Sequence, residues 1–211
     1  VDITPIEGLK ITLNGTVSDN EWKKTETVQP FYGNTAITYP GGYISKAAYQ
    51  TYTVNFQQII NYSKQIGKHS LTAMLGHENY KYKYDYITGD KENMFSFFGS
   101  QELDGAVKVV TTSSNTTDYN TEGYFSRLLY DYDGKYFAQA SYRRDASSRF
   151  HPDHRWGNFY SVGGAWILSK ENWFDVSWID MLKLKASWGQ QGNDDIGNYR
   201  YTDTYYLSNF N

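Results

Sequence analysis

The chain has 211 residues, no cysteine and a formal net charge of −3 at pH 7. So small a net charge, without any basic tract, argues against a nucleic-acid-binding protein. No run of about 18 apolar residues occurs, which excludes a transmembrane helix but leaves open strands of alternating polarity, whose average hydropathy is polar. Aromatic residues make up 18% of the chain and include 21 tyrosines, an excess typical of the aromatic belts of transmembrane barrels.

Alternating polarity predicts about eight long β-strands, because successive side chains of a strand point to opposite faces. The first ten residues, VDITPIEGLK, are expected to hold the tail of one strand, a turn at Pro5 and the start of the next. The long strands are then expected at about 8–28, 46–63 and 68–86, in a hairpin around Asp133-Gly134, and at about 157–169, 181–190 and 198–207. Asp-Gly between two such runs is a strong signal for a tight turn.

The connections between these strands alternate in length. Long polar loops are expected at 31–45 and 87–117, and a moderate one at 147–155, whereas 61–68 and 133–135 read as tight turns. The link at 170–180 is expected to hold a short turn of helix at a membrane interface. Short turns at one end and long loops at the other are typical of outer-membrane barrels.

The second half of the chain shows the two faces most clearly. One face carries Tyr136, Ala138, Ala140 and Tyr142, followed by Tyr160, Val162, Trp166, Leu168, Leu182, Leu184, Ala186 and Trp188. The other carries Gln139, Ser141, Arg143 and Asp145, followed by Lys183, Lys185 and Ser187. In a soluble sandwich the apolar face would point inward, whereas in an outer-membrane barrel it would contact lipid while the polar face lines the lumen.

Strand length favours the membrane alternative. Sandwich strands usually have about 5–6 residues, whereas a tilted strand needs about 9–11 to cross a bilayer, and several runs here exceed ten. The predicted fold class is therefore all-β, an antiparallel transmembrane β-barrel segment of about eight strands. A soluble all-β domain is the alternative.

Four stretches carry motifs in a specific order: YFSRLLYDYDGKYFAQASYRRDASSRF, RWGNFYSVGGAWILSKENWF, WIDMLKLKASWGQQGNDDIGNY and GKHSLTAMLGHE. They closely resemble the barrel of SusC/RagA-type TonB-linked outer-membrane proteins, and the likeness covers most of the chain from about residue 45. Ala146 stands where the family most often has Gly, and Trp188 where Tyr is common; neither change disturbs the alternation.

The resemblance implies a plugged barrel of about 22 strands. Residues 1–211 would then form part of one barrel domain, as a segment of a longer polypeptide, with the plug and the TonB-contacting region absent from this chain. It further implies import of oligosaccharides, or of peptides in some members, across the outer membrane of a Gram-negative bacterium. A SusD-like surface lipoprotein and the TonB complex, acting through the plug, would be its partners.

The densest charge cluster contains Arg143, Arg144, Asp145 and Arg149. Alternation directs Arg143 and Asp145 to the polar face and Arg144 to the lipid face near the rim, where it can reach headgroup phosphates. A salt-bridged rim is the plainer interpretation. The candidate ligand contacts on the lumen or rim are Arg143, Asp145, Arg149 and Tyr84, which lies between Tyr82 and Tyr86 beside Phe95, Phe97 and Phe98. These aromatic side chains fit an interface belt as well as a sugar-stacking surface.

Other polar motifs read as loops. His151-Pro-Asp-His154 has ligand-type side chains, but no further His or Cys lies nearby, so we expect no metal. Asp194-Asp195 fits a turn as well as a calcium site. No Ser-His-Asp order, phosphate loop or CxxC occurs, and we expect no catalytic residue and no cofactor.

Three functions remain to be separated. The first is a wall segment of a TonB-dependent nutrient importer, and the second is a soluble all-β module that binds glycan through exposed Tyr and Phe. The third is an outer-membrane enzyme on an eight-stranded barrel, which would have to use His151, Asp153 and His154. The chain is expected not to be an enzyme.

Overall fold

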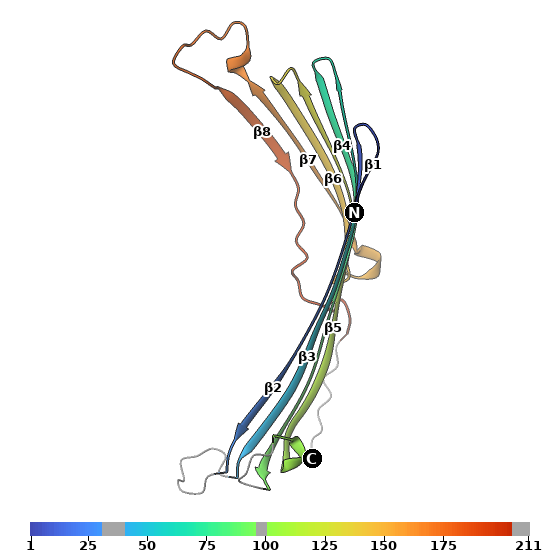
Figure 1. Cartoon of the computed structure of the whole chain (residues 1–211), viewed down its shortest axis with the longest axis vertical. Coiled ribbons are helices and arrows are strands. Elements are labelled where there is room, and N and C mark those ends of the chain that lie inside the picture. The colour runs from blue at the N-terminus through green and yellow to red at the C-terminus, as the bar shows by residue number, and fades with distance from the viewer. Residues whose placement is uncertain (31–40, 96–100, 204–211) are drawn as a thin grey trace. The chain divides into compact units, whose positions relative to one another are not determined.

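The structure is a computed structural model that describes residues 1–30, 41–95 and 101–203 (Figure 1). Its strands form one antiparallel sheet in which neighbours along the chain are also neighbours in the sheet, in the order β1 to β8. The strands are β1 Asp2–Ile6, β2 Leu9–Val28, β3 Tyr43–Ile66, β4 His69–Met94, β5 Ala106–Tyr132, β6 Tyr136–Ser147, β7 Trp156–Ile167 and β8 Lys183–Gly189. The all-β antiparallel prediction is confirmed.

The helical content of the described residues consists of three short 3₁₀ turns. These are η1 Leu103–Gly105, η2 Pro152–His154 and η3 Leu168–Lys170. The second lies in the loop between β6 and β7, where the sequence predicted a moderate connection. None of the helices described is long or apolar enough to traverse a bilayer.

The predicted loop at 87–117 is wrong over most of its length. Strand β4 continues to Met94 and β5 begins at Ala106, so η1 and its flanking residues occupy only the middle of that stretch. Polarity misled the prediction, because 88–93 and 111–117 are polar throughout, and a strand with two polar faces lacks the alternation by which strands are identified. Polar cross-strand contacts take its place, such as the hydrogen bond of Tyr86 with Ser113 at 3.3 Å.

The two ends of the chain also differ from expectation. Strand β1 runs through Pro5, which an edge strand tolerates, and the turn lies instead at Gly8, whose φ is +82°. The strand expected at 198–207 is not formed over 198–203, and 204–207 lie outside the described residues. In the link at 170–180, η3 ends at Lys170, and the residues that follow form turns without a helix.

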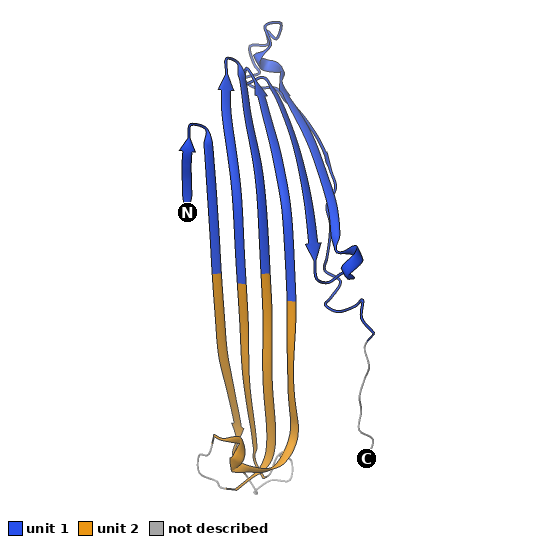
Figure 2. Cartoon of the chain, turned by 90° about the vertical axis from the view of Figure 1, so that its right-hand side faces the viewer, with its two compact units in different colours: residues 1–16, 54–80, 119–211 blue, residues 17–53, 81–118 orange. Residues whose placement is uncertain are grey.

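Contacts between residues divide the chain into two compact units (Figure 2). Unit 1 comprises Val1–Thr16, Val54–Tyr80 and Tyr119–Asn211, and unit 2 comprises Val17–Thr53 and Lys81–Asp118. Unit 2 has a small apolar core of Ile44, Met94 and Ala106, against which Leu103 packs. The candidate site lies within unit 1.

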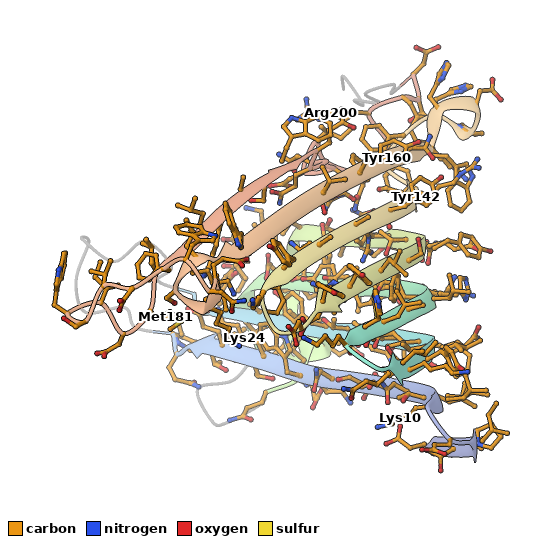
Figure 3. The ribbon with its side chains drawn as sticks, turned by 90° about the horizontal axis from the view of Figure 1, so that it is seen from above. Lys10, Lys24, Tyr142, Tyr160, Met181 and Arg200 are labelled. Atoms are coloured by element: carbon orange, nitrogen blue, oxygen red, sulfur yellow. The ribbon has the colours of Figure 1, made fainter. Side chains whose placement is uncertain are left out.

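In unit 1 the register of β6 and β7 builds one apolar face. Tyr142 lies opposite Tyr160, with ring centroids 5.1 Å apart, and both side chains are labelled in Figure 3. Tyr136 lies opposite Trp166, with centroids at 6.1 Å. Small and aliphatic pairs, Ala138 with Gly164 and Ala140 with Val162, fill the band between these two aromatic pairs. The aromatic pairs are about 20 Å apart along the strands. The predicted alternation is therefore confirmed here.

The Tyr136–Trp166 pair is tied to the link after η3. Glu171 accepts hydrogen bonds from the Tyr136 hydroxyl at 2.5 Å and from the Trp166 indole Nε1 at 3.0 Å. Lys135 lies 3.5 Å from the same carboxylate. A polar partner for each ring edge, together with an apolar ring face, is the arrangement that Tyr and Trp favour where apolar and aqueous surroundings meet.

Candidate functional site

A cavity of about 610 Å³ opens on the polar face of unit 1. It is lined mainly by side chains from β6 and β7 and by residues that follow β8. Its polar wall includes Glu78, Ser141, Arg143, Asp145, Ser161 and Gln190. The alternation that places Ala140 and Tyr142 on one face places Ser141, Arg143 and Asp145 on the other, so two of the predicted candidates line this cavity.

Arg143 is held by two carboxylates. Its Nε donates to both oxygens of Asp145, at 2.8 and 2.7 Å, and its Nη2 pairs with Glu78. The guanidinium carbon lies 5.5 Å from the centre of the Phe125 ring, and Gln57 donates to Glu78 at 3.2 Å. Two carboxylates around one guanidinium leave a net negative charge at this wall. The cluster therefore offers carboxylate oxygens as hydrogen-bond acceptors rather than a free cation.

The Phe125 ring can lie beside Arg143 because the neighbouring strand β4 has a glycine, Gly76, where the ring crosses it. A Cβ added to Gly76 would collide with the Phe125 ring, so only a residue without a side chain leaves room for that ring. Phe125 in turn supports Arg143. Glu78 and Phe125 were not among the predicted site residues, because only the pairing of β4 with β5 and of β5 with β6 brings them to Arg143.

Arg149 fastens the segment that follows β8, residues 190–198, which we call the strap. Its Nε donates to Asn198 Oδ1 at 2.9 Å, and its Nη1 donates to the carbonyl oxygen of Asp194 at 3.0 Å and lies 3.4 Å from Asp195 Oδ1. The guanidinium also lies over the Tyr119 ring, 4.4 Å from its centroid. Arg149 therefore has a structural role in binding the strap.

The Asp194 carboxylate is the second point of attachment. It accepts a hydrogen bond from the Tyr119 hydroxyl at 2.6 Å, and Arg149 Nη1 lies 3.8 Å away. Partial burial by itself raises the pKa of Asp194. The hydrogen bonds from Tyr119 and Ser147 and the charge of Arg149 outweigh that effect and hold the pKa below its ordinary value of 3.8. The folded state therefore favours the ionised form.

This lowered pKa predicts acid release of the strap. A carboxyl whose folded pKa is depressed contributes stability that is present above its unfolded pKa and is lost as the pH falls through the folded value. We expect amide exchange in 190–198 of the intact protein, corrected for intrinsic rates, to be unchanged from pH 7 to 5 and to accelerate below about pH 4. The Asp194→Asn variant should lose this dependence; an unaltered pH profile in the variant would contradict the assignment.

The four residues of the predicted charge cluster have three different environments. Arg143 and Asp145 pair with each other at the cavity, and Arg149 binds the strap. Arg144 is on the opposite face of β6, with its guanidinium carbon 5.0 Å from the centre of the Trp156 ring. The partners Glu78 and Asp194 were missed, since neither is close to the cluster in the sequence.

Tyr84 belongs to unit 2 and takes part in an aromatic cluster. Trp22 stacks on Tyr49 with centroids 3.9 Å apart, and Tyr49 in turn lies 6.4 Å from Tyr84 and 6.2 Å from Tyr86. Trp22 and Tyr49 were not predicted here, because only strand pairing aligns β2 and β3 with β4. Phe95 is 74% exposed, and Phe97 and Phe98 lie outside the described residues.

The histidine motif lies in η2 between β6 and β7. His151 Nδ1 is 3.6 Å from Asp153 Oδ2, both side chains are exposed, and the His151 ring meets the Tyr201 ring edge-on at 6.0 Å. Within residues 1–30, 41–95 and 101–203, no group of three His, Cys, Asp or Glu side chains is placed to hold a metal ion. His151 therefore contacts Asp153 of its own loop and Tyr201, which follows β8.

The sequence is similar to those of known receptors. No family model matches the chain. It is 31% identical over 161 residues to TonB-dependent receptor P39 of Formosa agariphila, covering 73% of this chain and 15% of that receptor. It is 29% identical over 192 residues to TonB-dependent receptor SusC of Bacteroides thetaiotaomicron, covering 90% of this chain and 18% of that one.

Two solved structures of a transporter also match this chain, in both fold and sequence. The structure of the RagAB peptide transporter matches with a TM-score of 0.87 and 30% identity, over 94% of this chain and 22% of that chain. The RagAB peptide importer in its open-open state matches with a TM-score of 0.87 and 29% identity, over 100% of this chain and 23% of that chain.

Fold and sequence together define the class of protein: the chain is a segment of a TonB-dependent receptor. Within that class it is SusC/RagA-like. It spans less than a quarter of the length of each of these matched chains.

Proposed function

We propose that the chain forms part of the wall of an outer-membrane barrel that imports large nutrients, oligosaccharides or peptides, in a TonB-dependent manner. One observation carries this proposal. On one face of unit 1, two aromatic pairs flank a band of alanine, glycine and valine, and the opposite face of the same strands is polar. A wall that separates lipid from a hydrated lumen requires these two faces.

In this function the two faces of the wall have different roles. The apolar band holds the strands in the hydrocarbon of the bilayer, while the polar face lines the path of the ligand. Arg143 and Asp145 at the cavity, Arg149 beneath the strap and Tyr84 in the aromatic cluster of unit 2 are the proposed ligand contacts. The carboxylate-rich wall around Arg143 would accept hydrogen bonds from sugar hydroxyls or peptide amides.

The proposed partners follow from the relatives. The RagAB importer is named for two components, which supports a SusD-like surface lipoprotein as the partner of the intact receptor. The names of the curated relatives support energy transfer from the TonB complex, which would act through the plug of the intact receptor. All these relatives are named as receptors, transporters or importers, which favours transport over an enzymatic function.

The orientation of the sheet can be tested with single cysteines, since this chain has none of its own. In the intact receptor in native outer membranes, we expect Ser141→Cys and Ser161→Cys to react with a small charged thiol reagent through the lumen. Ala140→Cys and Val162→Cys, the neighbouring positions on the apolar face, should react only with a lipid-soluble maleimide. Reaction of all four with the charged reagent would contradict the assignment of the two faces to lipid and lumen.

A further inference from the structure

Arg144 is a charged residue on the apolar face. In the register of the sheet it lies opposite Tyr124 of β5 and opposite Asn158 of β7, on the side away from Arg143. The side chain is exposed, and no carboxylate among the described residues lies within ion-pair distance of it. Since no carboxylate of the described residues pairs with this exposed guanidinium, its N–H donors are available to water or to a polar group outside this sheet.

The surroundings of Arg144 place it just beyond the apolar band. Tyr142 and Tyr160 form the aromatic pair at the edge of that band, and Arg144 lies two residues further along β6. Tyr124 and Trp156, 47% and 40% exposed, stack beside it with ring centroids 5.9 Å apart. In a barrel wall this row of rings marks the interface, which is the depth at which lipid headgroups carry their phosphates.

The polar groups at this position can bind an anion. The Arg144 guanidinium lies over the Trp156 ring, which limits its motion while leaving its N–H donors free of any carboxylate among the described residues. Asn158 Oδ1 accepts a hydrogen bond from the Tyr142 hydroxyl at 2.8 Å, so the amide NH₂ of Asn158 remains a donor. A guanidinium and an amide on adjacent strands suit the oxygens of one phosphate group.

We propose that Arg144, Trp156 and Asn158 form a binding site for the phosphate group of a membrane lipid, a proposal that rests on the membrane-wall function above. A lipid fits better than a soluble anion because the site adjoins the apolar band. A lipid whose phosphate group binds at Arg144 would place its acyl chains along the exposed side chains of Leu128 and Val162. Lipid binding at this site would fix the height of the wall in the bilayer.

The Glu122 carboxylate reduces the net positive charge around Arg144. Its carboxylate accepts a hydrogen bond from the Tyr124 hydroxyl at 2.7 Å and lies 3.4 Å from His77 Nε2. A negative charge near the site opposes phosphate binding. The Glu122→Gln variant should therefore bind a lipid phosphate more tightly than the parent.

The test uses the intact receptor in detergent and two lipids with the same acyl chains, phosphatidic acid and diacylglycerol, with binding measured by native mass spectrometry. We expect Arg144→Gln to weaken phosphatidic acid binding about tenfold and to leave diacylglycerol binding unchanged. Arg127→Gln is the matched control, since Arg127 is an arginine of β5 on the opposite face. This control should bind both lipids like the parent.

Each other outcome overturns a defined part of the proposal. Equal phosphatidic acid binding by the Arg144 and Arg127 variants would disprove the phosphate site while leaving the membrane wall intact. Displacement of phosphatidic acid by millimolar inorganic phosphate would show that the site takes free phosphate instead of a lipid. Failure of the parent to retain phosphatidic acid would also disprove the phosphate site, whereas reaction of Ala140→Cys and Val162→Cys with the charged thiol reagent would contradict the membrane wall itself.

Discussion

Replacing Val162 with arginine is expected to destabilise the intact receptor by about 2–4 kcal/mol, the cost of a cation on the lipid face near the bilayer midplane. Val162 is 52% exposed and lies between the two aromatic pairs, opposite Ala140 and Trp188. The residues that form the apolar band carry no carboxylate to neutralise the new charge. The free energy of unfolding, measured by denaturant titration of receptor folded in lipid vesicles, reports this cost.

The matched control places the same cation on the other face. Gln139 lies on β6 next to Ala140 and lines a second cavity, of about 550 Å³, on the polar side of unit 1. The Gln139→Arg variant should change the unfolding free energy by less than about 1 kcal/mol, since its charge stays in water. Equal costs for the two variants would mean that the faces do not separate lipid from lumen.

Replacing Arg149 with methionine is expected to release the strap. The change removes the donors to Asn198 and to the Asp194 carbonyl, and it leaves the half-buried Asp194 carboxylate without its cation. Because Asp194 retains 34% of its side-chain exposure, solvent screening limits the loss to about 1–3 kcal/mol. Amide exchange of 190–198 in the intact receptor should then be faster by about tenfold to a hundredfold.

One further variant separates the charge of Arg149 from its geometry, and a second serves as a control. Arg149→Lys keeps the cation but not the planar group that reaches Asn198 and Asp194 together, so we expect an intermediate exchange rate. Arg127→Met removes an arginine of β5 that lies opposite Ser141, on the polar face, and should leave exchange in 190–198 unchanged. Equal protection in the Arg149→Met variant and the parent would show that the strap is held by other contacts.

Periodicity predicted the strands wherever one face differs from the other in polarity. Between Tyr136 and Trp188 the alternation of apolar and polar side chains identified both the strands and their faces, and the structure confirms this. At 88–93 and 111–117 both faces are polar, so the same reasoning indicated a loop where β4 and β5 continue. These residues form strands because their backbones hydrogen-bond to neighbouring strands. The local alternation of polarity along the sequence does not report such pairing.

The candidate site was predicted only in part, for the same reason. Alternation assigned Arg143 and Asp145 to the polar face and Arg144 to the apolar face, and the register confirms that division. The partner of Arg143 on β4, Glu78, is 65 residues away in the sequence, and the Asp194 that Arg149 binds is 45 residues away. No local signal connects residues at such separations.

The amino-acid order alone determined that the chain forms antiparallel strands with one apolar and one polar face, because side-chain direction in a strand alternates from each residue to the next. The tertiary structure decided the register, the carboxylates around Arg143 and the path of the strap over the polar face. These depend on pairing between strands and on charge contacts across tens of residues, and they exist only when the sheet has formed.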